Sequence, residues 1–210
     1  MSWIRRHRKV SIIVGLGGAS IRTDVDLRQK YINIRYIIKI KMSEKWGLRF
    51  TLAAIFHGVF AAVWSGLFIA DQFGIQLNMA KIVAGGSVGT WLTLGYLLYL
   101  IAGVMGNMAF GSIYGLISRN QRGHLFSDKL ALTHFILFNV GVIGVTWPMG
   151  YVGFLGGSLL LAGKTAEIHP KIVGFVLPIG ISVAIGVLST LIGATNIILS
   201  LMRTIKEKDT

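Results

Sequence analysis

Four long blocks without a charged residue constrain this chain more than any other feature of its sequence. They cover residues 50–70, 82–118, 130–163 and 172–202. A helix of about 20 apolar residues crosses the roughly 30 Å of hydrocarbon in a bilayer. The blocks therefore predict an all-α integral membrane protein, a four-helix bundle with spans at about residues 50–70, 88–117, 130–155 and 172–202. The third span is predicted to end at about residue 155, before the end of its block, because Gly156 and Gly157 are expected to break the helix.

Composition agrees with a chain that lies mostly in lipid. Hydrophobic residues make up 53% of it, and its mean hydropathy is +0.68, well above that of a soluble domain. The chain has no cysteine. Disulfides, thiolate-bound metals and iron–sulfur clusters are therefore excluded, and any cofactor would be held by His, Met or oxygen ligands.

The basic residues behind the net charge of +13 lie outside the predicted spans, so this charge does not indicate nucleic-acid binding. With four spans, the amino terminus, the second loop and the carboxyl terminus share one side and carry 12, 3 and 3 Lys plus Arg. The opposite side carries only Lys81, Lys164 and Lys171. Because basic loops stay in the cytoplasm, both termini are predicted to be cytoplasmic in a multi-pass protein of the cell membrane.

The basic N-terminal extension, residues 1–41, does not resemble the transmembrane domain at 42–210. The alternating residues at 31–35 favour a strand or an interfacial segment. Met42 begins a typical entry to a span, so we expect translation to begin at Met42 and not at Met1. An intact mass of the native protein that includes residues before Met42 would contradict this interpretation.

Ionisable residues inside spans are costly and are functional candidates by default. The blocks contain two, His57 in the first span and His134 in the third. At 1.5 Å per residue, both lie in the cytoplasmic half, at depths of roughly 10 Å and roughly 6 Å. Asn107, Asn139 and Asn196 fall in the same half. Two interpretations stay open: the histidines are axial haem ligands or a metal site, or all five residues hydrogen-bond between helices.

Other chemistries find no support in the sequence. It contains no Ser-His-Asp, paired-carboxylate or His-Glu-x-x-His arrangement, and no block contains a carboxylate. Hydrolysis and proton-coupled transport through a buried acid are disfavoured, and no catalytic residue is assigned. The 27 glycines indicate closely packed helices, or contact with another subunit.

One stretch resembles the penultimate helix of haem-copper oxidase subunit I, of the cytochrome c or quinol oxidases. The matching residues begin at Lys129-Leu130-Ala131-Leu132-Thr133-His134-Phe135 and continue through Leu137, Gly141, Val142, Pro148, Met149, Gly153 and Gly156. Upstream, Phe110-Gly111-Ser112-Ile113-Tyr114 is similar to the end of the preceding family helix. The resemblance covers at most the last four helices of that family.

The sequence departs from the family at its metal ligands. Gly95-Tyr96-Leu97 stands where the family has haem-ligating histidines, and Gly150 replaces a histidine that usually follows the Pro-Met pair. Gly157-Ser158-Leu159 replaces the two arginines that hold haem propionates. The resemblance therefore carries over His134 and no metal ligand.

Three functions remain as hypotheses. The leading one is a subunit-I-like membrane component of a haem-copper-oxidase-type respiratory complex without its own dinuclear centre, so that any enzymatic activity would belong to the oxidase complex. Its partners would be the lipid bilayer and other membrane subunits. The second is a small electron-transfer protein that binds haem through His57 and His134. The third is a channel or transporter subunit.

Overall fold

The computed structural model describes residues 10–16, 19–25, 27–120 and 125–208, and the side chains of residues 45–119, 125–203 and 205. Four helical stretches in this part of the chain are long and apolar enough to cross a membrane: Lys45–Phe73, Gly89–Arg119, Asp128–Leu161 and Thr165–Arg203. Each coincides with one predicted span. The prediction of a multi-pass membrane protein with four spans is confirmed.

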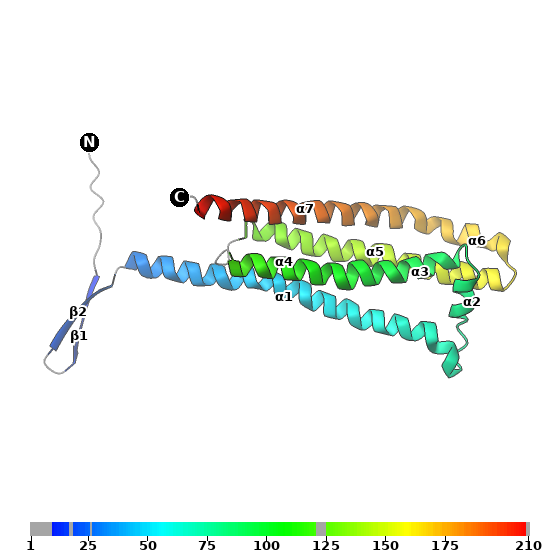
Figure 1. Cartoon of the computed structure of the whole chain (residues 1–210), viewed down its shortest axis with the longest axis horizontal. Helices are drawn as coiled ribbons and strands as arrows, with labels where there is room; N and C mark the ends of the chain where they lie inside the picture. The colour runs from blue at the N-terminus through cyan, green and yellow to red at the C-terminus, as the bar shows by residue number, and fades with distance from the viewer. Residues whose placement is uncertain (1–9, 17–18, 26, 121–124, 209–210) are drawn as a thin grey trace.

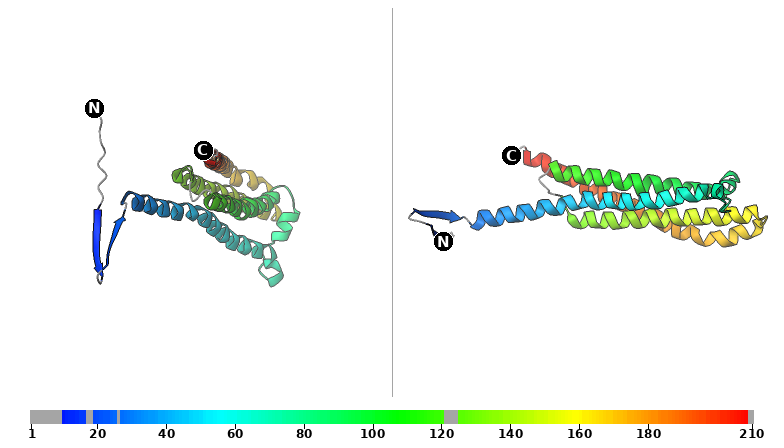
Figure 2. Two further views of the ribbon diagram at one scale, coloured as in Figure 1. Left: turned by 60° about the vertical axis from the view of Figure 1, so that its left-hand side comes forward. Right: turned by 90° about the horizontal axis from the view of Figure 1, so that it is seen from below.

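The spans run alternately up and down as a bundle (Figure 1). In chain order the elements are α1 (Leu27–Ile69), η1 (Ala70–Phe73), α2 (Met79–Ala84), α3 (Gly89–Leu98), η2 (Tyr99–Gly106), α4 (Asn107–Asn120), α5 (Asp128–Leu161), α6 (Thr165–Ile172), η3 (Val173–Phe175) and α7 (Val176–Lys208). The start of α5 and the ends of α4 and α7 lie at one end of the bundle, here called the terminal end. Helices α2 and α6 lie at the opposite, distal end, as both figures show (Figure 2).

Ahead of the bundle lies an antiparallel hairpin that the sequence did not predict. Strands β1 (Val10–Leu16) and β2 (Ala19–Val25) pair with Val10 opposite Val25. Of the two alternatives given for 31–35, the strand is wrong, because these residues lie within α1. A helix satisfies its own backbone hydrogen bonds, whereas a strand there would need a partner. The all-α prediction therefore holds for the membrane domain and not for the extension.

The turn after the first span is held by one carboxylate. Oδ1 of Asp71 accepts hydrogen bonds from the backbone N–H groups of Leu77, at 2.7 Å, and Asn78, at 2.8 Å. Gly74, with φ of +83°, ends η1. Gly86, with φ of +63°, lies in the turn before α3, where the sequence placed the entry to the second span.

Helix α5 continues to Leu161, so the predicted end near residue 155 is wrong. Gly156 and Gly157 do not break the helix, because they serve close packing. A Cβ at Gly156 would clash with Val88, and one at Gly157 would clash with Ile82. A glycine inside a helix costs about 1 kcal/mol relative to alanine, and here the missing Cβ leaves room for Val88 and Ile82 against α5.

Small residues also bring α5 close to the helices on either side of it. A Cβ at Gly95 of α3 would lie 2.8 Å from the backbone of α5. On the opposite side, a Cβ at Gly141 would lie 2.9 Å from Gly186 of α7. These approaches confirm the packing role expected for the glycines, and they make α5 the central helix of the bundle.

The second span contains a π-helical segment, η2, between α3 and α4. A π-helix adds a residue to the turn and changes the direction of the side chains that follow; such segments are frequent at functional sites. No feature of the sequence predicted this segment. Tyr99, at the start of η2, is buried and points its hydroxyl toward the site described next.

Candidate functional site

The buried polar side chains of the spans form two groups, one around each histidine. The first group, the His57 network, contains one residue from each of α1, η2, α4 and α5: His57, Tyr99, Asn107 and Asn139. Nδ1 of His57 lies 2.9 Å from the Tyr99 hydroxyl, and its Nε2 lies 2.8 Å from Oδ1 of Asn139. The network therefore joins three of the four spans through a single imidazole.

The hydrogen bonds of Asn139 assign the tautomer of His57. Its Nδ2 donates to the carbonyl of Phe135 at 2.8 Å, so its Oδ1 must face His57. The same Oδ1 accepts a bond from Nδ2 of Asn107 at 3.1 Å. Because Oδ1 only accepts, Nε2 of His57 carries the proton, and its Nδ1 accepts from the Tyr99 hydroxyl. Both ring nitrogens of a neutral His57 are thus used.

The surroundings of His57 leave it little freedom. The residue is 2% exposed, and a Cβ at Gly103 of η2 would lie 3.3 Å from the imidazole. Asn107 is itself held by a bond from its Nδ2 to the Gly103 carbonyl at 2.8 Å. A glycine at this point of η2 lets the backbone approach the ring, so the π-helical segment and the network fit together.

The second group, the His134 cluster, is more apolar. Nδ1 of His134 lies 3.1 Å from the hydroxyl of Tyr114, and the backbone carbonyl of His134 accepts a bond from Ser189 at 2.8 Å. The imidazole is fully buried, and the ring of Phe110 meets it edge-on at 4.4 Å between centroids. A Cβ at Gly193 of α7 would clash with it. The cluster therefore packs α4, α5 and α7 together.

Nε2 of His134 is buried and makes no hydrogen bond within the described part of the chain. Burying an imine nitrogen or an N–H group without a partner costs stability, and in native proteins such an atom calls for an explanation. It is the ring nitrogen that is free to act as a ligand.

Neither histidine, as placed, fits an axial haem ligand. The lone pair of His57 is already taken by Tyr99. Around His134 the rings of Phe50, Phe110, Tyr114 and Phe138 all lie within 6 Å between centroids, and Gly193 closes a further side. A porphyrin needs an open plane beside its ligand, and these side chains occupy that space. The described residues also contain no group of three or more His, Cys, Asp or Glu that could hold a metal ion.

The remaining predicted polar residue, Asn196, belongs to a separate contact near the terminal end. Its Oδ1 accepts a hydrogen bond from the backbone N–H of Ser127 at 3.1 Å, and Ser127 caps the start of α5. Asn196 therefore ties α7 to the first turn of α5. The sequence placed His57, Asn107 and Asn139 in one half of the membrane, and the structure brings these three together.

Sequence reasoning missed the two tyrosines that complete the groups. Tyr99 is 1% exposed and Tyr114 is fully buried. Tyrosines in an apolar block are normally assigned to the membrane interface. For Tyr99 the available signal was its place in the middle of the block 82–118, because a tyrosine deep in a span needs a hydrogen-bond partner. Tyr114 lies four residues from the end of that block, so its position gave no such signal.

Comparisons with known proteins give no match: no family model, no curated protein and no solved structure is similar to this chain.

Proposed function

We propose that this protein is a structural membrane subunit of a haem-copper-oxidase-type respiratory complex, without its own dinuclear centre. The His57 network supports a structural role for the subunit. Both ring nitrogens of His57, the ionisable side chain of the first span, hydrogen-bond to side chains of other spans. Such a residue holds helices in place and has no lone pair left for chemistry.

The oxidase part of the proposal rests on the sequence resemblance. The matching residues 129–156 lie on α5, and residues 110–114 lie on α4. The two helices are consecutive, antiparallel spans (Figure 1), as the corresponding helices of subunit I are expected to be. The positive-inside rule places the terminal end of the bundle in the cytoplasm.

The outer surface of the bundle offers room for partner subunits. An apolar groove of about 530 Å³ runs between η2, α5 and α7 and is lined partly by Ala102, Gly141 and Gly186. Helix α7 leaves large apolar side chains exposed along its length, including Leu177, at 71%, and Leu191, at 61%. In a membrane these surfaces contact lipid or other spans.

Copurification tests the proposal. The protein, carrying an affinity tag and expressed in its own membrane, should retain subunits of a respiratory oxidase after mild solubilisation, identified by mass spectrometry. A tagged unrelated four-span protein from the same membrane is the control. If no oxidase or other respiratory subunit is enriched over this control, the proposal is wrong.

A haem-binding electron carrier is the second candidate, because Nε2 of His134 has no hydrogen-bond partner among the described residues. Binding of haem there would require Phe110 and α7 to move apart. A reduced-minus-oxidised visible spectrum of the purified protein, alongside His57→Ala and His134→Ala variants, decides between the candidates. A haem band lost in His134→Ala alone would replace the structural proposal, whereas a colourless protein removes the haem function.

A further inference from the structure

Cations border every span at the terminal end of the bundle. Arg49, Arg119, Lys129 and Arg203 are each the residue immediately outside one of the four uncharged blocks, and all four are exposed. They therefore lie at the boundary between hydrocarbon and water, at the depth of lipid phosphates.

Two of these arginines are held against aromatic rings. Cζ of Arg49 lies 4.4 Å from the centroid of the Trp46 ring, and Cζ of Arg203 lies 4.7 Å from that of Phe126. A guanidinium over a ring is oriented by the cation–π interaction and keeps its N–H donors available at its edge. These two side chains are therefore positioned, unlike freely moving surface lysines.

The two rings are themselves held by hydrogen bonds, Trp46 to the start of α5 and the backbone of Phe126 to α7. Nε1 of Trp46 donates to Oδ1 of Asp128 at 2.9 Å, and the backbone N–H of Phe126 donates to Oγ of Ser200 at 2.9 Å. Trp46 is 5% exposed. Arg49 of α1 therefore packs on a ring that bonds to Asp128, and Arg203 of α7 packs on the ring of Phe126, two residues earlier in the chain. We call Arg49 and Arg203 the arginine pair.

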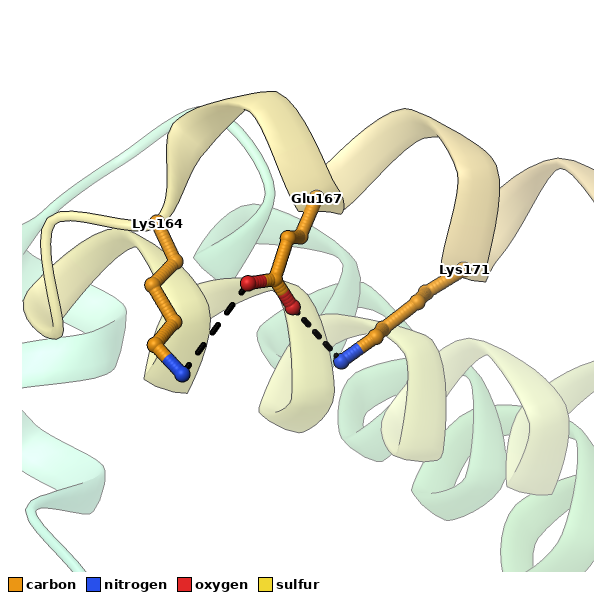
Figure 3. Close-up of polar contacts among 3 residues, drawn as sticks. All are labelled: Lys164, Glu167 and Lys171. Atoms are coloured by element: carbon orange, nitrogen blue, oxygen red, sulfur yellow. Dashed lines mark ion pairs between the residues drawn. The ribbon is translucent and has the colours of Figure 1, made fainter.

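Neither member of the arginine pair has an acidic partner among the described residues. The ion pairs found there lie at the distal end, where Glu167 lies 2.8 Å from Lys171 and 3.9 Å from Lys164 (Figure 3). The distal lysines are therefore partly neutralised within the chain. Among the described side chains at the terminal end, the negatively charged one is Asp128, and it accepts a hydrogen bond from Trp46.

We infer that the arginine pair binds the headgroup phosphate of an anionic phospholipid, whose acyl chains lie against the apolar side chains beside it. Two oriented guanidiniums at phosphate depth, neither of them in an ion pair within the described part of the chain, suit a phosphate ester recognised through several N–H donors. Leu48 and Leu52, at 59% and 54% exposed on α1, give the acyl chains an apolar surface. This inference does not depend on the proposed function.

Native mass spectrometry of the purified protein, titrated with phosphatidylglycerol or phosphatidylcholine, tests the inference. Each basic residue near an anionic surface contributes about fivefold in affinity. The double variant Arg49→Gln/Arg203→Gln should therefore bind phosphatidylglycerol roughly 30-fold more weakly than the wild type. Each single variant should lose about fivefold, which keeps the test informative if the double variant does not fold. Arg49→Lys/Arg203→Lys keeps both charges but loses the oriented guanidinium N–H donors, so its affinity should lie between those of the wild type and the double variant Arg49→Gln/Arg203→Gln.

A matched control removes the same net charge from the opposite end. Lys164→Gln/Lys171→Gln should leave the affinity for phosphatidylglycerol within about twofold of wild type. Equal binding of the two lipids, or equal losses in the terminal and distal variants, would overturn the inference. Displacement of the lipid by millimolar inorganic phosphate would assign the pair to a free anion. Unchanged lipid binding together with loss of copurifying proteins would assign it to a protein partner.

Discussion

Replacing Asn139 by leucine removes the acceptor at the centre of the His57 network. Its Oδ1 accepts hydrogen bonds from His57 at 2.8 Å and from Asn107 at 3.1 Å. The variant leaves both N–H groups buried without this partner. Hydrogen bonds between spans contribute on average about 0.6 kcal/mol and at most about 1.7 kcal/mol. Losing two should lower the free energy of unfolding by about 1–3 kcal/mol.

The assay is reversible unfolding by sodium dodecyl sulfate in mixed micelles, followed by circular dichroism. Ser112→Ala is the control, since this exposed hydroxyl bonds only to the Met108 carbonyl in its own helix, at 2.9 Å. Its effect should stay below about 0.5 kcal/mol. Equal effects of Asn139→Leu and Ser112→Ala would refute the reasoning.

A double-mutant cycle then isolates the contact between His57 and Asn139. The variants His57→Phe and Asn139→Leu should show a coupling of about 0.5–1.7 kcal/mol, because each single change leaves a buried polar group that the double change removes. Strictly additive effects would mean that the two side chains do not stabilise the bundle as a pair.

The remaining predictions concern packing, surface charge and topology. Gly95→Ala should lower the free energy of unfolding by about 1–3 kcal/mol in the same assay, because the added methyl meets the backbone of α5 at 2.8 Å. Gly58→Ala is its control: no atom lies within 4 Å of the added Cβ, so the free energy of unfolding should not fall and can rise by up to about 1 kcal/mol. Glu167→Gln breaks two exposed ion pairs and should change stability by less than about 1 kcal/mol, with a smaller effect at high salt. Since the chain has no cysteine, single cysteines can report topology: Thr165→Cys should react with an impermeant maleimide on intact cells, and Lys45→Cys only after permeabilisation. Labelling of both from outside would contradict the up-and-down order of the spans.

Bilayer physics explains why the membrane domain could be predicted so fully. In hydrocarbon a spanning chain must satisfy its backbone hydrogen bonds internally, so long uncharged blocks allow little besides helices. The errors fall where that constraint ends. The segment 31–35 lies outside the blocks, and local alternation there predicted a strand where α1 continues. At Gly156 and Gly157 local propensity predicted a helix end, but tertiary contacts with Val88 and Ile82 keep α5 helical.

The candidate site was only partly predictable for a related reason. The sequence by itself determined the number of spans and which rare polar residues lie in lipid, including His57 and His134, because both follow from the cost of polar groups in hydrocarbon. It could not name their partners, since the direction of a side chain depends on helix rotation and on the register change in η2. Only the tertiary structure decided that Tyr99 and Asn139 take both ring nitrogens of His57 while Nε2 of His134 finds no partner in the described part of the chain, because hydrogen bonds between spans depend on how neighbouring helices pack.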